Sequence, residues 1–346
     1  MARCLHRSST THTPSLARRK RFRGTTVSIF PQNLLGALRA DSPRHASLFL
    51  HVIFGSVATS ALLAAGVAPV LASSGATVFY LLVAFAWRAR GQQPAAVFCG
   101  TFAGMTSFFV FFNRAPFNLR FSILVYLSIA ILTGSLYVLI MCFEHKLPKR
   151  LFSGYGGRLG AIAFIASAAC LLITGLLIRL FSGDFQLLVL KDSAAFSEKA
   201  PLVMILTSAL GSFLTRRLAK DIDSTIPGLN VVLSASVCGF AGGIILLFLP
   251  PWGPIASLYW YAGNFAGMSS SAILDSHGRI FVAGAITGVF LAGLHYYGSG
   301  AGGLLGFSAF LAVIVLKGFL RYTLAEGIDG LHQIHNGDGN RLALTR

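Results

Sequence analysis

The octapeptide Gly100-Thr101-Phe102-Ala103-Gly104-Met105-Thr106-Ser107 recurs later in the chain as Gly263-Asn264-Phe265-Ala266-Gly267-Met268-Ser269-Ser270, with six of eight positions identical. Each copy lies near the middle of an apolar stretch about as long as a bilayer is thick. Glycines and hydroxyl-bearing residues at that depth, in corresponding positions of two halves, are typical of membrane proteins with internal repeats. The peptide therefore indicates an internal duplication.

The composition of the chain excludes a soluble domain. Of its 346 residues, 55% are hydrophobic and only 11% are charged, and the mean hydropathy is +0.71. Soluble domains carry roughly a quarter charged residues. We therefore expect an all-α polytopic membrane protein that contacts the lipid bilayer.

The net charge of +17 is concentrated near the N-terminus, where residues 1–44 contain nine Arg and Lys and one acid. Basic residues that flank membrane spans face the cytoplasm and anionic lipid. Nothing in the remaining sequence resembles a nucleic-acid-binding module. We therefore expect no nucleic-acid partner.

Apolar stretches predict ten membrane-spanning segments, which divide the chain into five parts. The parts are a basic disordered cytoplasmic arm (1–45), a first transmembrane repeat (46–182), an inter-repeat linker (183–199), a second repeat (200–322) and a polar cytoplasmic tail (323–346). The spans are predicted at residues 47–71, 74–88, 94–112, 118–142, 158–181, 200–215, 226–249, 254–274, 279–298 and 301–320.

Loop charges predict the orientation of the spans. Most basic loop residues fall on the side of the N-terminal arm, whereas the other loops carry only Arg114, Lys191 and Lys199. This bias favours ten spans with both termini cytoplasmic, in a bacterial inner (plasma) membrane. An Arg- and Ser-rich, acid-poor start is also typical of a mitochondrial transit peptide, so the mitochondrial inner membrane is the alternative.

The two octapeptides fall in predicted spans three and eight, which assigns five spans to each repeat. Because five is odd, the second repeat enters the membrane from the opposite side, and the two repeats are expected to be inverted. This plan is similar to that of urea transporters and some anion transporters. The resemblance concerns the fold plan alone and transfers no residue roles.

The octapeptides are the predicted functional site. Both spans begin at a proline, Pro94 or Pro254, and glycines weaken the helix at mid-membrane, so spans three and eight are expected to be broken or closely packed. The alternative is purely structural, because each copy contains a GxxxG pattern that lets two helices pack closely. The predicted substrate-binding residues are Gly100, Thr101, Phe102, Gly104, Thr106, Ser107, Gly263, Asn264, Phe265, Gly267, Ser269 and Ser270.

The distribution of acids narrows the expected function. All eleven Asp and Glu residues lie outside the predicted spans, and His51 and His295 lie toward span ends. Proton-driven carriers usually hold a carboxylate or a histidine relay within the membrane. We therefore expect a transporter or channel that moves a small polar neutral solute or a small inorganic anion between the two repeats; coupling to sodium is left open.

Two rival functions remain. A membrane-embedded enzyme acting on a lipid or a lipid-linked substrate would use Glu144, His145, Asp275 and His277, although Ser276 is also expected to cap a helix. A non-catalytic membrane subunit would use the basic arm to bind a partner. No Ser/His/Asp, HExxH or P-loop pattern is present, so we expect no enzyme activity, no metal and no cofactor. A homo-oligomer is left open.

The predicted topology can be tested by cysteine labelling. A single cysteine placed within 182–199 is expected to react with a membrane-impermeant maleimide added outside, because this loop is predicted to be external. A cysteine within 146–150 is expected to react only after the membrane is permeabilised. The reverse pattern would refute the predicted orientation.

Overall fold

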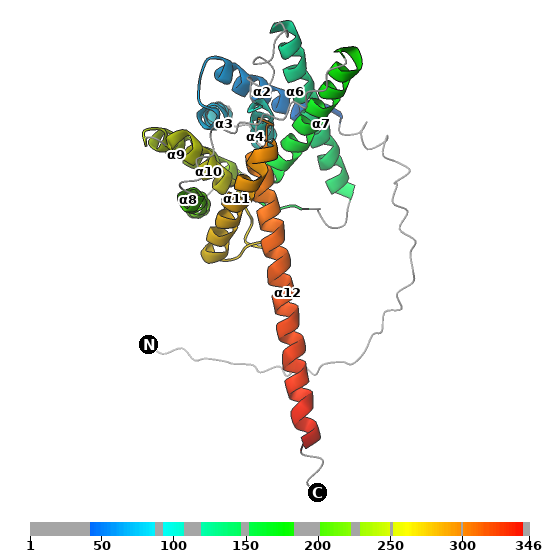
Figure 1. Cartoon of the computed structure of the whole chain (residues 1–346), viewed down its shortest axis with the longest axis vertical. Coiled ribbons are helices and arrows are strands. Elements are labelled where there is room, and N and C mark those ends of the chain that lie inside the picture. The colour runs from blue at the N-terminus through cyan, green and yellow to red at the C-terminus, as the bar shows by residue number, and fades with distance from the viewer. Residues whose placement is uncertain are drawn as a thin grey trace, which may run out of the picture. The chain divides into compact units, whose positions relative to one another are not determined.

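The computed structural model describes residues 42–86, 93–106, 119–146, 152–182, 201–222, 229–249, 252–298 and 300–341 (Figure 1). Within these ranges the chain forms helices joined by turns, with no strand. The helices are α2 Ser42–Ala64, α3 Pro69–Ala86, α4 Gln93–Gly104, α6 Leu119–Lys146, α7 Arg158–Ser182, α8 Pro201–Asp221, α9 Leu229–Leu247, α10 Gly253–Gly267, α11 His277–Gly298 and α12 Leu304–Arg341.

Eight of the described helices are long and apolar enough to cross a membrane, which confirms an α-helical polytopic membrane protein. Large apolar side chains remain exposed on them, as expected where the surrounding solvent is lipid. The other two, α4 and α10, correspond to predicted spans 94–112 and 254–274 but end early, at Gly104 and Gly267. The octapeptides therefore lie where these two helices stop.

The boundary between the first two predicted spans was wrong. The sequence predicted a span over 47–71, but α2 ends at Ala64 and α3 begins at Pro69. Gly66 adopts a φ of +85°, a left-handed conformation that stops the helix, and proline is well suited to the first turn of the next one. The apolar character continues through this turn, so hydropathy alone does not reveal it.

The prediction that every acid lies outside the spans was also wrong, at Glu144. Helix α6 continues to Lys146, past the predicted end at residue 142, and Glu144 is only 8% exposed within this helix. It forms an ion pair with Arg158 at the start of α7, with 2.6 Å between Nη1 and Oε1. A buried carboxylate is tolerated here because the opposite charge lies beside it.

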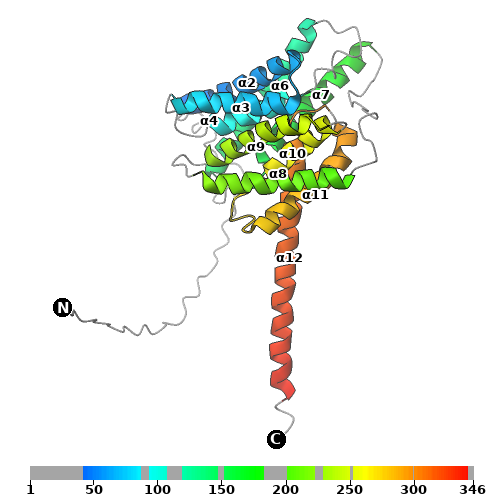
Figure 2. The same ribbon diagram turned by 90° about the vertical axis from the view of Figure 1, so that its left-hand side faces the viewer.

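The short helices pack against long ones in two similar groups. Helix α4 lies against α2, and α10 lies against α8, as Figure 2 shows for the blue-to-cyan helices and the green-to-yellow helices. Helix α3 contacts both α2 and α9, and α9 contacts α10. The two groups thus share an interface formed by α3, α4, α9 and α10.

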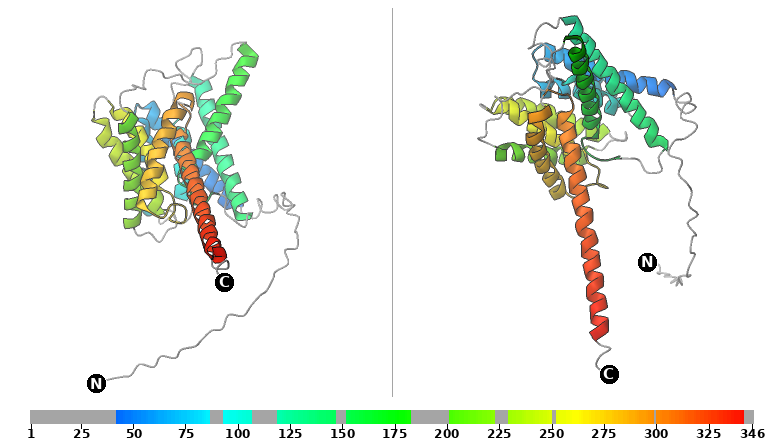
Figure 3. Two further views of the ribbon diagram at one scale, coloured as in Figure 1. Left: turned by 60° about the horizontal axis from the view of Figure 1, so that its bottom comes forward. Right: turned by 45° about the vertical axis from the view of Figure 1, so that its right-hand side comes forward.

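Helices α7 and α12 cross at a pair of glycines, Gly160 and Gly306. A Cβ on either glycine would lie against the Cα of the other, so the two backbones are in direct contact. Helix α12 also packs on α10 and α11, and Figure 3 shows it between α7 and these helices. This crossing requires residues without side chains.

Substituting Gly160→Ala is expected to destabilise the protein by about 1–3 kcal/mol, because the new methyl group forces two backbones apart. Gly175→Ala in the same helix is the control, since a Cβ there meets nothing within 4 Å. That change is expected to be neutral or stabilising, by up to about 1 kcal/mol. Thermal unfolding in detergent measures both, and equal effects would refute the role of the crossing.

Candidate functional site at the ends of α4 and α10

Helices α4 and α10 are too short to cross a bilayer. Both begin near a proline, since Pro94 is the second residue of α4 and Pro254 lies in the first turn of α10. They contain 12 and 15 residues, or about 18 and 22 Å of helix, against a hydrocarbon core of roughly 30 Å. Every residue from Gly100 to Gly104 and from Gly263 to Gly267 is buried, so both helices end inside the protein.

The glycines of the two octapeptides form matching backbone contacts. Each faces the backbone of the neighbouring long helix, where a side chain would collide with a carbonyl group. Both GxxxG patterns therefore pack helices closely, although each packs its short helix against α2 or α8 and not the two short helices against each other. The contacts are Gly100 with Val52, Gly104 with Ser56, Gly263 with Ser208 and Gly267 with Ser212.

The phenylalanines of the two octapeptides meet each other. The ring centroids of Phe102 and Phe265 lie 4.7 Å apart in an edge-to-face arrangement. Each ring also contacts an aromatic residue one turn earlier in its own helix, Phe98 at 4.5 Å and Tyr261 at 4.6 Å. All four side chains are at most 2% exposed, so the ends of α4 and α10 are joined by a buried aromatic cluster.

A hydroxyl group follows the end of each short helix and bonds to a distant turn. Thr106 Oγ1 donates to a carbonyl in the last turn of α4 (2.7 Å) and accepts from Gly302 N (3.1 Å). Ser269 Oγ does the same after α10, donating at 2.8 Å and accepting from Gly156 N at 3.1 Å. Each helix end is thus held by the turn that precedes α12 or α7.

These turns contain a second repeated motif that our sequence analysis missed. The pattern Gly-x-Gly-Gly occurs at residues 154–157 before α7 and at residues 300–303 before α12. Its first and last glycines adopt positive φ in both copies, from +79° to +88°. A four-residue match is weak alone, but its spacing to the following helix could have revealed it. We call the two helix ends and these two turns the central junction.

Thr101 lies in a hydrogen-bonded group of hydroxyls within the central junction. Its Oγ1 donates to Phe98 O (2.9 Å) and accepts from Ser73 Oγ (3.1 Å), and Thr77 Oγ1 lies 3.4 Å away. Ser73 Oγ also lies 3.1 Å from the hydroxyl of Tyr261. This group links α3 and α4 to α10.

Asn264 occupies the octapeptide position of Thr101 and has different partners. The hydrogen-bond network orients its amide so that the oxygen accepts from Gly239 N (3.0 Å). The nitrogen then donates to Thr215 Oγ1 (3.2 Å) and to the carbonyls of Gly211 and Trp260 (both 3.0 Å). This buried amide therefore joins α8, α9 and α10.

The backbone carbonyl groups that follow the two short helices accept hydrogen bonds from different kinds of side chain. Thr106 O accepts from the hydroxyl of Tyr126 (3.1 Å), whereas Ser269 O accepts from Nη1 of Arg216 (2.7 Å). A cation near a helix C-terminus is stabilising by roughly 0.3–1 kcal/mol, and more when partly buried. The end of α10 therefore has a positive charge beside it.

Eleven of the twelve predicted site residues lie in the central junction, and Ser107 lies outside the described residues. Ser270 is held through its backbone, with its N–H donating to Gly154 O (2.8 Å). In this conformation the polar side chains of Thr101, Thr106, Asn264 and Ser269 are fully buried and bonded within the protein. Solute binding by these residues stays a prediction.

Of the residues assigned to the rival enzyme, Glu144 and Asp275 are ion-paired, whereas Nε2 of His277 is buried without a hydrogen-bond partner. Glu144 is bound by Arg158, and both oxygens of Asp275 accept from Arg279 at 2.7 Å. Ser276 Oγ accepts from the backbone N–H of Arg279 (3.2 Å), which confirms the expected helix cap. Over the described part of the chain, no group of three His, Cys, Asp or Glu residues is arranged to hold a metal.

Comparison with known proteins adds no family to this description. No protein-family model matches the sequence, and neither a curated protein nor a solved structure is similar to it.

The substitution Thr106→Val tests the hydroxyl after α4. It preserves the side-chain shape but leaves the buried N–H of Gly302 without its acceptor, at an expected cost of about 1–3 kcal/mol in unfolding free energy. Thr207→Val is the control, because that hydroxyl bonds only to Val203 O on the surface of α8. A denaturant titration that finds equal stabilities for the two variants would contradict the described role.

Proposed function

We propose that the protein is a membrane transporter or channel that moves a small polar neutral solute or a small inorganic anion between two inverted repeats of five crossings. The observation that carries this proposal is the meeting of two short helices whose buried ends bear matching glycine, phenylalanine and hydroxyl residues. In transporters built from inverted repeats, interrupted helices place the solute site at the interface between the repeats.

The directions of the first-repeat helices support an odd number of crossings. Helix α6 is antiparallel to α2, since its late residue Cys142 lies 3.3 Å from His45 at the start of α2. Helix α4 is parallel to α2, because Gly100 faces Val52 and Gly104 faces Thr59. The start of α4 and the start of α6 therefore lie on opposite sides of the membrane, which amounts to one crossing. The helices from α2 to α7 thus supply five membrane crossings.

The contacts between the two groups support inversion. The start of α7 lies beside the end of α6, and hence on the side where α2 begins. Gly156, just before α7, bonds to Ser269, which is itself bound by Arg216 near the end of α8. Helix α8 thus ends on the side where α2 begins, so the two helices run in opposite directions.

A buried hydroxyl without a partner supports a solute site at the end of α4. Thr59 on α2 is fully buried against Gly104, and its Oγ1 has no hydrogen-bond partner. Its counterpart on α8 is Thr215, which is packed against Gly267 in the same way and accepts from Asn264 (3.2 Å). Leaving a buried hydroxyl unpaired costs about 1–3 kcal/mol, so the hydroxyl of Thr59 is suited to a polar solute that enters the junction.

The charges around the junction favour a neutral or anionic solute. The polar side chains of the junction are hydroxyls and an amide, and the nearby formal charges are those of Arg216 and of Arg158, which is paired with Glu144. A cation channel would require carbonyl rings or carboxylates along its path. We further propose a bacterial inner membrane as the location, with both termini in the cytoplasm, on the basis of the loop charges.

The substitution Thr59→Val tests the proposed function in proteoliposomes. Flux of urea, chloride and nitrate is measured one solute at a time, together with the unfolding free energy of each variant. Flux of the transported solute is expected to fall about 2- to 10-fold, as for the loss of one hydrogen bond of roughly 0.5–1.5 kcal/mol. Stability is expected to be unchanged or higher, because an unpaired polar group has been removed.

Thr215→Val is the matched control, since it removes the same group from a hydroxyl that already has a partner. It is expected to destabilise the protein by about 1–3 kcal/mol through the amide of Asn264. If wild-type protein moves none of the three solutes, or if Thr59→Val lowers stability without lowering flux per folded molecule, the proposed solute site is wrong.

A further inference from the structure

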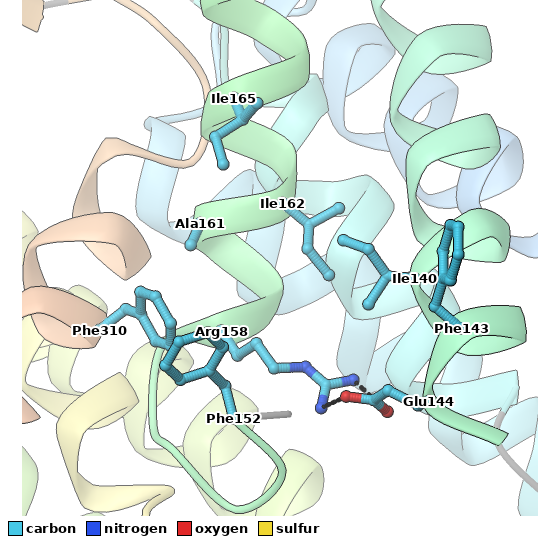
Figure 4. A pocket seen from close by; sticks show the side chains of 9 residues that line it. All are labelled: Ile140, Phe143, Glu144, Phe152, Arg158, Ala161, Ile162, Ile165 and Phe310. Carbon is cyan, nitrogen blue, oxygen red and sulfur yellow. Dashed lines mark hydrogen bonds and ion pairs between the residues drawn. The ribbon is translucent and has the colours of Figure 1, made fainter. Parts of the chain in front are cut away.

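A pocket of about 400 Å³ lies beside the central junction, between α6, α7, α12 and the segment before α7 (Figure 4). Its size is within the range of roughly 300–1,000 Å³ that is common for ligand sites. Its walls are formed by apolar side chains, including Ile140 and Phe143 of α6, Ile162 and Ile165 of α7 and Phe310 of α12. The pocket therefore touches helices of both proposed repeats.

The polar side chains at this pocket are the ion-paired Glu144 and Arg158, which lie along one edge in Figure 4. Two guanidinium nitrogens of Arg158 donate to the two oxygens of Glu144, at 2.6 and 3.1 Å. The carboxylate thus receives two hydrogen bonds from one guanidinium group, and the methylene stem of Arg158 lines the pocket. A soluble polar ligand would find few free hydrogen-bonding groups on these walls.

Phe152 lines the pocket and has a strained backbone conformation. Its φ of +56° is uncommon for a residue with a bulky side chain. The ring contacts Phe310 at 5.3 Å and Tyr155 at 5.7 Å, both edge to face. Strained residues cluster at functional sites, because the surrounding structure must hold them in place.

The surroundings of the pocket indicate whether lipid or water reaches it. The lining residues of α6 and α7 belong to helices long and apolar enough to cross a membrane. Ile165 is 52% exposed at the rim, and Leu139 and Leu172 nearby along the same helices are 42% and 54% exposed. Such surfaces are covered by lipid tails rather than by water. An apolar pocket is a poor site for water, which needs two to four polar partners.

We propose that this pocket binds one acyl chain of a glycerophospholipid. The chain inserts between α6, α7 and α12 with its end away from the ion pair of Glu144 and Arg158, and contacts Phe152 and Phe310. It thereby fills the space beside the crossing of α7 and α12 and stabilises that crossing. The inference does not depend on transport, because it rests on the pocket alone.

The test uses the full chain in nanodiscs that contain phosphatidylcholine with a photoactivatable diazirine on its acyl chain. After irradiation and proteolysis, mass spectrometry is expected to find adducts concentrated on residues 152–165 and around Phe310. Ile165→Trp fills the rim and is expected to lower these adducts about tenfold, which corresponds to 1.4 kcal/mol. Ile173→Trp is the matched control, because Ile173 is 54% exposed on the same helix outside the pocket.

A second measurement, of the Tm, distinguishes loss of lipid binding from misfolding of a variant. Added phosphatidylcholine is expected to raise the Tm of the detergent-solubilised wild type and of Ile173→Trp, but not of Ile165→Trp or Phe152→Ala. Adducts spread evenly along α7, or equally reduced in both tryptophan variants, would overturn the proposal. So would crosslinks from the pocket to a second copy or to residues 1–40, since a protein segment would then be the occupant.

Discussion

A helix that ends inside a membrane protein must have its last carbonyl groups satisfied by the protein itself. Up to four carbonyls at a helix end lack partners within the helix, and lipid offers none. Helices α4 and α10 both end in this way, at Gly104 and Gly267. Much of the central junction follows from this constraint, since hydroxyls, a tyrosine and an arginine all donate to carbonyls at these two ends.

The partners that satisfy each helix end come from distant parts of the chain. Thr106 is bonded to the turn before α12, and Ser269 to the turn before α7. A movement of either short helix away from its turn would break one of these hydrogen bonds. Helices α7 and α12 also touch at Gly160 and Gly306, so a continuous series of contacts joins the two helix ends. Such linked packing suits a protein that changes between two arrangements.

The sequence predicted the parts of this structure that depend on local composition. The lengths of the apolar stretches predicted most of the helices. The repeated octapeptide lies where α4 and α10 end. Hydropathy missed the turn at Gly66, because the flanking residues are also apolar. The pairing of Thr106 with Gly302 joins residues 196 positions apart, so no local pattern reveals it. The pocket was missed for the same reason, since its walls come from three helices and a turn.

The proposed repeats differ most in where they place positive charge. The residue after the Gly-x-Gly-Gly turn is Arg158 in one half and Leu304 in the other. The carbonyl after the short helix is bound by Arg216 in one half and by Tyr126 in the other. In the proposed inverted arrangement, both arginines lie on the side where α2 begins. A site between such repeats would have one charged approach and one neutral approach. An anion would then be attracted from one side only, whereas a neutral solute would be affected little, so the asymmetry favours the anion among the two proposed solute classes.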